Sequence, residues 1–133
     1  MAAIIPLKDF QPKSTEKSGE SEKTFQGLAS RIPPVPGNIT DEARKHWYFI
    51  GERLVAAGLL CEVDLGQFQI LCQTWSLYVE AHRECELKGE YQNTKTGYQQ
   101  LAPWAIARER HANRYQKVAD KFFLSPRARK AVD

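Results

Sequence analysis

The sequence predicts an all-α protein of three main helices, with a small β-hairpin or loop between the second and third and a short helix at the C-terminus. Three observations lead to this class. Apolar residues recur at spacings of three and four in three separate stretches. A capping residue or a proline precedes each stretch, and a glycine follows the first two. One polar segment rich in turn-forming residues interrupts the pattern between residues 90 and 100.

The N-terminal segment, residues 1–37, is predicted to lie outside the helical domain. Residues 1–30 are rich in Ser, Lys, Glu and Gly. They carry too little apolar surface to offset the entropy of ordering, so we expect disorder there. Residues 31–37, RIPPVPG, hold three prolines and predict an extended strap at the domain edge. The helical domain is therefore expected to span residues 38–133.

The first helix is expected to begin at Thr40, a favoured N-cap residue, and to stop near Gly58. Its apolar face repeats through Ala43, Trp47, Ile50, Leu54 and Ala57.

The second helix is expected from about Val63 to Lys88, with Asp64 as a possible cap. Its stretch LGQFQILCQTWSLYV is apolar on most of its circumference. Such a helix must be central or must face another chain, and a small domain has little protein with which to cover it. Self-association is therefore expected. The predicted oligomer contacts are Leu65, Phe68, Ile70, Leu71, Trp75, Leu77 and Tyr78.

The remaining elements follow from turn and capping chemistry. Glu90–Gln100 predicts a short hairpin, with a plain loop as the alternative. The third helix opens at Pro103, a favoured first-turn position, and ends near Phe122. Ser125 then caps a separate short helix that begins at Pro126.

Charge is unevenly distributed along the chain. Residues 38–102 hold six Lys/Arg and nine Asp/Glu, whereas residues 103–133 hold eight and three. A basic helix face is often only a solvated surface, but an acid-poor and Arg-rich segment also fits a polyanion or the acidic part of another copy. On the basis of charge alone, the candidate nucleic-acid contacts are Arg108, Arg110, Arg114, Lys117, Lys121, Arg127, Arg129 and Lys130.

Residues suited to catalysis are sparse. No phosphate-binding glycine loop and no nucleophile elbow is present. The three cysteines lack the close spacing of a zinc site and are expected to be buried thiols, so no metal or cofactor is predicted. His82 and His111 are expected in the core or at an interface, and His46 is expected to be exposed. No apolar run is long enough to span a membrane. We expect a protein without enzymatic activity.

The order of several segments resembles a known family. The proline lead-in RIPPVPGNITDEARKHW is followed by ERLVAAGLL, by EVDLGQFQILCQTWSLYVEA, and, after the polar segment, by LAPWAIARERHANRYQKVADKF and LSPRAR. Together, over about residues 31–132, they resemble the small terminase subunit of tailed bacteriophages, in the group found with cohesive-end siphophages. The family pattern has a glycine before the L-x-P-x-A-R segment, where this chain has Phe123.

The resemblance implies an assembly and a role. It implies a closed ring of roughly 8–12 copies. Such a ring binds double-stranded viral DNA near the packaging start in the cytoplasm of the infected bacterial host. It also recruits and regulates a large subunit that carries the ATPase and nuclease. Two alternatives remain open: a helical virion-assembly adaptor that binds only protein, and a small dimeric DNA-binding regulator.

Overall fold

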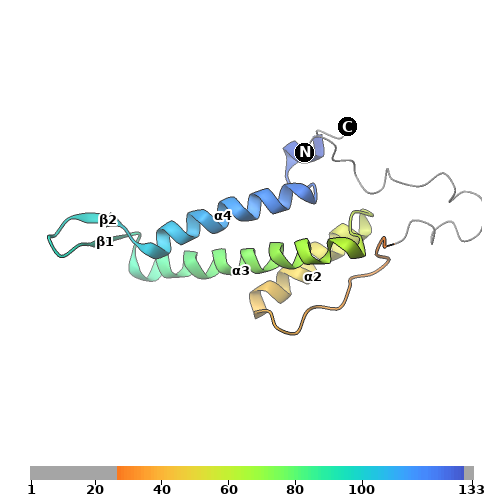
Figure 1. Cartoon of the computed structure of the whole chain (residues 1–133), viewed down its shortest axis with the longest axis horizontal. Helices are drawn as coiled ribbons and strands as arrows, with labels where there is room; N and C mark the ends of the chain where they lie inside the picture. The colour runs from red at the N-terminus through yellow and green to blue at the C-terminus, as the bar shows by residue number, and fades with distance from the viewer. Residues whose placement is uncertain (1–26, 131–133) are drawn as a thin grey trace, which may run out of the picture.

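The computed structural model describes residues 27–130, so the disorder expected for residues 1–26 lies outside the described residues. Its elements are α2 (Asp41–Ala56), η3 (Glu62–Asp64), α3 (Leu65–Lys88), β1 (Tyr91–Asn93), β2 (Gln99–Leu101), α4 (Pro103–Lys121) and α5 (Pro126–Lys130). Figure 1 shows α3 and α4 lying side by side as a long antiparallel hairpin, with β1 and β2 projecting from one end and α2 beside the other half of α3. The predicted class, three main helices with one small hairpin, is confirmed.

Capping chemistry sets two of the three helix starts as predicted. The Thr40 hydroxyl accepts a hydrogen bond from the amide of Ala43 at 3.2 Å, which satisfies one free donor of the first turn of α2. Pro103 occupies the first turn of α4. The start of α3 differs, because one 3₁₀ turn precedes Leu65. The Asp64 carboxylate accepts from the amide of Cys61, at 3.3 Å, and makes no side-chain cap for α3.

The hairpin between α3 and α4 is a two-stranded antiparallel ladder. Tyr91 pairs with Leu101, and Asn93 pairs with Gln99. Gly97 lies in the turn at a φ of +86°, a conformation that glycine adopts without steric cost. The turn chemistry of this polar segment therefore selects the hairpin over the plain loop.

The core lies where α2, α3 and the C-terminal end of α4 meet. The rings of Trp47 and Phe68 pack at a centroid distance of 4.5 Å, and Phe122 meets Phe68 edge to face at 6.0 Å. Leu54 and Leu71 are fully buried beside them. This cluster fixes the position of α2 on the α3–α4 hairpin, and with it the direction in which each outer face points.

The segment before α2 packs against this core. Leu28 forms an antiparallel bridge with Cys61, and the indole N–H of Trp47 donates to the carbonyl of Pro33 at 3.0 Å. Ile32 is partly buried against the core, and a Cβ on Gly51 would lie only 3.4 Å from its side chain. The prolines suit this path because they leave no backbone N–H to satisfy. The described part of the predicted tail and strap, residues 27–37, is therefore a wall of the domain.

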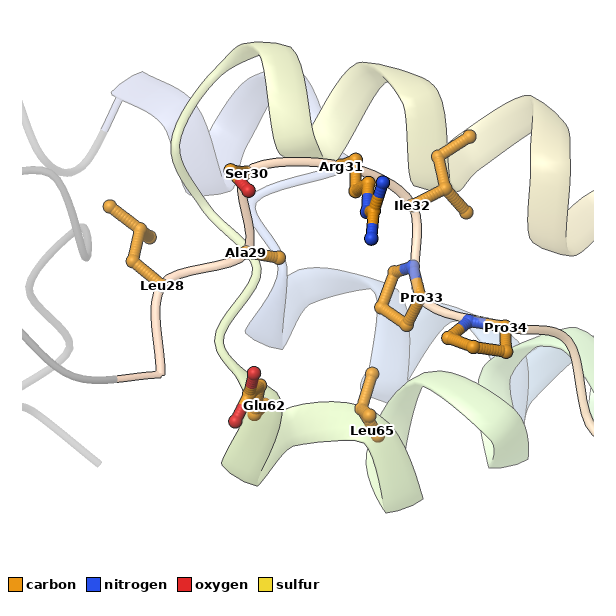
Figure 2. Close-up of a pocket in the computed structure, with 9 residues that line it drawn as sticks. All are labelled: Leu28, Ala29, Ser30, Arg31, Ile32, Pro33, Pro34, Glu62 and Leu65. Atoms are coloured by element: carbon orange, nitrogen blue, oxygen red, sulfur yellow. The ribbon is translucent and has the colours of Figure 1, made fainter. Parts of the chain in front are cut away.

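A hollow of about 750 Å³ separates this wall from the start of α3 (Figure 2). Its walls come from residues 28–34 on one side and from Glu62 and Leu65 on the other. The side chains that Figure 2 labels are mostly apolar, and Arg31 and Glu62 are the two charged ones. The extended segment is tied to the helical domain on both sides of this hollow, at Leu28 and at Pro33.

Candidate nucleic-acid interface

Four of the eight candidate cations form one stripe along α4. Arg110, Arg114, Lys117 and Lys121 follow one another at spacings of four, three and four residues, and all four are exposed. Such spacings place them on one face of a helix, over about 17 Å of its length. We call this set the basic stripe.

The basic stripe runs along an exposed side of α4, next to the buried Val118. The buried residue Ala119 is two positions from both Lys117 and Lys121, or about 200° around the helix. The two acids of α4 lie to one side of the stripe: Glu109 directly precedes it, and Asp120 lies three residues after Lys117, about 60° around the helix. Among the described residues, no ion pair involves a stripe residue. The stripe is therefore an exposed row of positive charge, with the two acids of α4 beside it.

Arg108 is separated from the stripe. Its guanidinium lies 3.0 Å from the carboxylate of Glu90, and its side chain is only 16% exposed. The other guanidinium nitrogen lies 3.5 Å from the ring of His82. Arg108 thus joins α4 to the end of α3 and the first residue of the hairpin segment, and it is not presented to a ligand.

The remaining three cations lie on the short helix α5. Arg127, Arg129 and Lys130 are exposed, and Ser125 caps the helix by accepting from the amide of Ala128 at 3.0 Å. The guanidinium of Arg129 also donates to the carbonyl of Phe123 at 3.1 Å. The predicted cap and start of this helix are confirmed.

The turn between α4 and α5 is anchored by two buried aromatics. Phe122 and Phe123 are 4% and 8% exposed. Phe123 adopts a φ of +59°, the left-handed region that residues with a side chain occupy at a cost. The family resemblance predicts a glycine at this position. The Phe123 ring is buried, and the short helix α5 begins at Pro126.

The seven predicted oligomer contacts fall into three groups by their exposure. Phe68 and Leu71 are 0% exposed inside the chain, so neither reaches a partner, and they are not carried forward. Leu65, Trp75 and Tyr78 are half-buried, whereas Ile70 and Leu77 are the most exposed of the set. The seven predicted contacts therefore combine residues that pack inside the chain with residues on the outer face of α3.

Two exposed aromatic residues were missed. Tyr48 and Phe49 on α2 are 45% and 54% exposed. The guanidinium of Arg53 lies 3.9 Å from the centre of the Phe49 ring. One sequence feature could have indicated their exposure: both residues fall outside the three- and four-residue apolar repeat of this helix.

The histidines were only partly predicted. The expectation that His46 is exposed is wrong, because it is 9% exposed and stacks on Trp75 at a centroid distance of 5.1 Å. Burial lowers the pKa of His46 to about 4, so the ring is neutral at pH 7. His82 is half-exposed and lies 3.4 Å from Glu86. Burial, with a smaller effect of Arg114, lowers the pKa of His111.

The described residues offer no arrangement for metal chemistry. Within residues 27–130, no three His, Cys, Asp or Glu side chains gather as metal ligands would. The described cysteines Cys61, Cys72 and Cys85 are buried as free thiols, as expected from the sequence. In the same part of the chain, no helix combines the length and apolarity of a membrane span. The prominent chemical feature is the positive charge of α4 and α5.

The described residues form a small helical protein whose α4 carries an exposed row of cations. The chain belongs to the phage terminase small subunit family, whose model matches residues 43–133. Members are generally non-catalytic proteins of DNA packaging. No match was found among curated proteins or among solved structures. The family assignment made from the sequence is confirmed, and the finer assignment to the cohesive-end group stays a prediction.

Proposed function

We propose that this chain is the DNA-recognition subunit of a phage packaging machine. It assembles as a multimeric ring in the cytoplasm of the infected bacterial host and binds double-stranded viral DNA. The ring recruits and regulates the large subunit that carries the ATPase and nuclease. The observation that carries this proposal is the exposed basic stripe of α4, in a chain of the terminase small subunit family.

The stripe fits phosphate recognition in length and chemistry. Phosphates of one DNA strand follow at about 3.4 Å along the helix axis, so a stripe of about 17 Å runs past about five of them. Two of its four members are arginines, whose planar forks suit phosphate oxygens. The stripe residues lie on an outward face, and we assign no element to a DNA groove. Binding would then depend on phosphate contacts and on DNA shape, more than on base edges.

The cations of α5 would extend this surface. Arg127, Arg129 and Lys130 follow the stripe in sequence, and all three are exposed. The turn held by Phe122 and Phe123 sets their position relative to α4. We include all three in the proposed DNA contacts, and we exclude Arg108 because Glu90 already neutralises it.

The test compares two variants that remove equal charge. The first carries Arg110→Gln, Arg114→Gln and Lys117→Gln in the stripe. The control carries Arg44→Gln, Arg83→Gln and Lys95→Gln, three cations that lie elsewhere. Affinity for a mixed-sequence duplex is measured over a range of salt concentrations. Each lost phosphate contact lowers the salt slope by about 0.9, so the stripe variant should lose about 2–3 units and the control much less.

Two outcomes would overturn the DNA assignment. One is a stripe variant with the affinity and salt slope of the wild type. The other is a control that loses as much as the stripe variant, because the effect would then follow net charge and not position. A third variant, with Arg127, Arg129 and Lys130 changed together to Gln, tests α5 in the same way.

Native mass from near-physiological salt tests the assembly. One discrete species of roughly 8–12 copies fits a closed ring, because closed symmetry gives one large species. A dimer would favour the regulator instead. A multimer that binds no DNA even at low salt would favour the adaptor.

A further inference from the structure

The β1–β2 hairpin projects beyond the ends of α3 and α4 (Figure 1), and none of its strand residues is buried. Directly opposite residues of an antiparallel ladder share a face, so Tyr91, Asn93, Gln99 and Leu101 lie together. All four are exposed, Tyr91 and Leu101 at 58% and 44%. We call these four residues the ladder face. An isolated two-stranded hairpin is only marginally stable in water, so the hairpin's own stability does not explain this exposed face.

Amide side chains dominate the two strands. Four of the six strand residues are amides, namely Gln92, Asn93, Gln99 and Gln100. No strand residue is β-branched, so strand propensity does not account for this composition. The side-chain hydrogen bonds between described hairpin residues come from Thr94 and Thr96. Each amide therefore keeps a donor and an acceptor free for a partner.

The hairpin is fixed to the helices at the end where its two strands meet them. The amide of Ala102 donates to the carbonyl of Glu90 at 2.9 Å. The indole N–H of Trp104, in the first turn of α4, donates to the carbonyl of Gly89 at 2.6 Å. These bonds tie the last residues before α4 to the first residues after α3. The direction in which the ladder face is presented is thus set by the α3–α4 hairpin.

The acids beside the hairpin are already occupied. The contacts are Glu84 with Lys88 at 3.9 Å, Glu86 with His82 at 3.4 Å, and Glu90 with Arg108 at 3.0 Å. From residue 91 to residue 108 the chain has no Asp or Glu. A polyanion that meets the hairpin therefore finds no carboxylate on it, and the acids that precede it each contact a basic side chain.

We propose that the ladder face enters a groove of double-stranded DNA, where Asn93 and Gln99 contact base edges. The major groove is about 12 Å wide and admits a two-stranded β-ribbon, whose strands lie about 4.8 Å apart. Asparagine and glutamine each pair there with both N6 and N7 of adenine. Tyr91 and Leu101 supply apolar contact on the same face, of the kind that thymine methyl groups take. A protein partner would instead favour a face with an apolar or aromatic centre.

This inference rests on the proposed function, because it requires that the chain binds duplex DNA. It adds the contact that chooses among sequences. The basic stripe begins at Arg110, seven residues after Pro103, or about 10 Å along α4 from the hairpin. The stripe and the hairpin are thus close enough to meet one duplex. Affinity then comes mainly from phosphate contacts of the stripe, and discrimination comes from the hairpin.

The test selects binding sites from a random-sequence duplex pool. The first variant, Asn93→Ala with Gln99→Ala, removes the amides of the ladder face. The matched control, Gln92→Ala with Gln100→Ala, removes two amides from the opposite face. The wild type and the control should enrich the same sequence and prefer it over a scrambled duplex. The first variant should lose about 10-fold or more of that preference, because it loses bidentate contacts to bases. Its salt slope should stay unchanged, because no cation is removed.

Gln99→Arg gives a readout that a folding defect does not mimic. Arginine pairs with O6 and N7 of guanine, so this variant should prefer guanine at one position where the wild type prefers adenine. Circular dichroism and a thermal melt check that each variant is folded.

The outcomes separate the hairpin from the stripe. A first variant that keeps the wild-type preference overturns the inference, and a change in its native mass would then make the hairpin a protein contact. Equal losses in the first variant and the control also overturn it, because the effect would not follow the ladder face. A wild type that binds duplexes but enriches no sequence overturns the hairpin contact and leaves phosphate binding standing. A wild type that binds no duplex at low salt overturns both.

Discussion

The imidazole Nε2 of His46, on α2, lies 2.7 Å from the phenol oxygen of Tyr115, on α4. Trp75 of α3 stacks on the same imidazole, so one ring contacts all three main helices. Burial lowers the pKa of His46 to about 4 and raises the pKa of Tyr115 to about 12. Both groups are therefore neutral at pH 7, and the hydrogen bond joins two uncharged side chains.

This contact predicts that stability falls in mild acid. An unfolded histidine has a pKa of about 6.5, so between pH 6.5 and pH 4 the unfolded chain binds a proton that the folded chain does not. The stability that neutral His46 contributes is complete above pH 6.5 and is lost as the pH falls towards 4. We expect a loss of about 3 kcal/mol from this residue by pH 4, measured by urea unfolding at a series of pH values.

His46→Gln should flatten this pH dependence, because glutamine takes up no proton. His111→Gln is the matched control. The pKa of His111 is also lowered, but its ring is less buried, so most of the slope should remain. If the stability of His46→Gln still fell with pH as that of the wild type does, the assignment of this acid sensitivity to His46 would be wrong.

Docking of the segment before α2 can be tested at Trp47. Trp47→Phe removes the indole donor to the Pro33 carbonyl in a fully packed site. We expect a loss of about 1–2 kcal/mol in the free energy of unfolding. Trp104→Phe is the comparison, because Trp104 also donates to a backbone carbonyl, that of Gly89, but from a more exposed position. Trp104→Phe should lower the free energy of unfolding by less than Trp47→Phe does. A larger loss for Trp104→Phe would argue against the docking of the segment before α2.

The left-handed Phe123 predicts an unusual order of variants. Phe123→Ala and Phe123→Gly both lose a buried ring, at a cost of about 3 kcal/mol. Glycine also removes the steric cost of the φ of +59°. Phe123→Gly should therefore be more stable than Phe123→Ala by about 1 kcal/mol in chemical unfolding. Equal stability, or a more stable alanine variant, would show that the turn is not held in this conformation.

Arg108 and Arg114 differ in role although they lie on the same helix. Arg108→Gln breaks the ion pair with Glu90 and should lower stability by less than about 1 kcal/mol, because Glu90 is half-exposed. It should leave the salt slope of DNA binding unchanged. Arg114→Gln should do the reverse, lowering the slope by about 0.9 with little effect on unfolding. Titrations and melts of both variants check this, and a slope change at Arg108 would return it to the DNA surface.

Local rules predicted the elements well where one residue controls the backbone. Thr40 as a cap, Pro103 in a first turn and Gly97 in a reverse turn each act within a few residues of their own position. The 3₁₀ turn before α3 was missed because Asp64 bonds back to Cys61 and makes no cap for the helix that follows.

The sequence by itself determined the helical class, the basic charge of residues 103–133 and the family, and it predicted the hairpin with a loop as the alternative. These depend on periodicity, turn chemistry and the order of motifs, which are local or additive along the chain. Only the tertiary structure decided which face of each helix is covered. It buried His46, docked the segment before α2 and withdrew Arg108 into an ion pair. It also split the apolar surface of α3 into a core and an outer face. The physical reason is that burial depends on contacts between residues far apart in sequence, which periodicity along one helix does not specify.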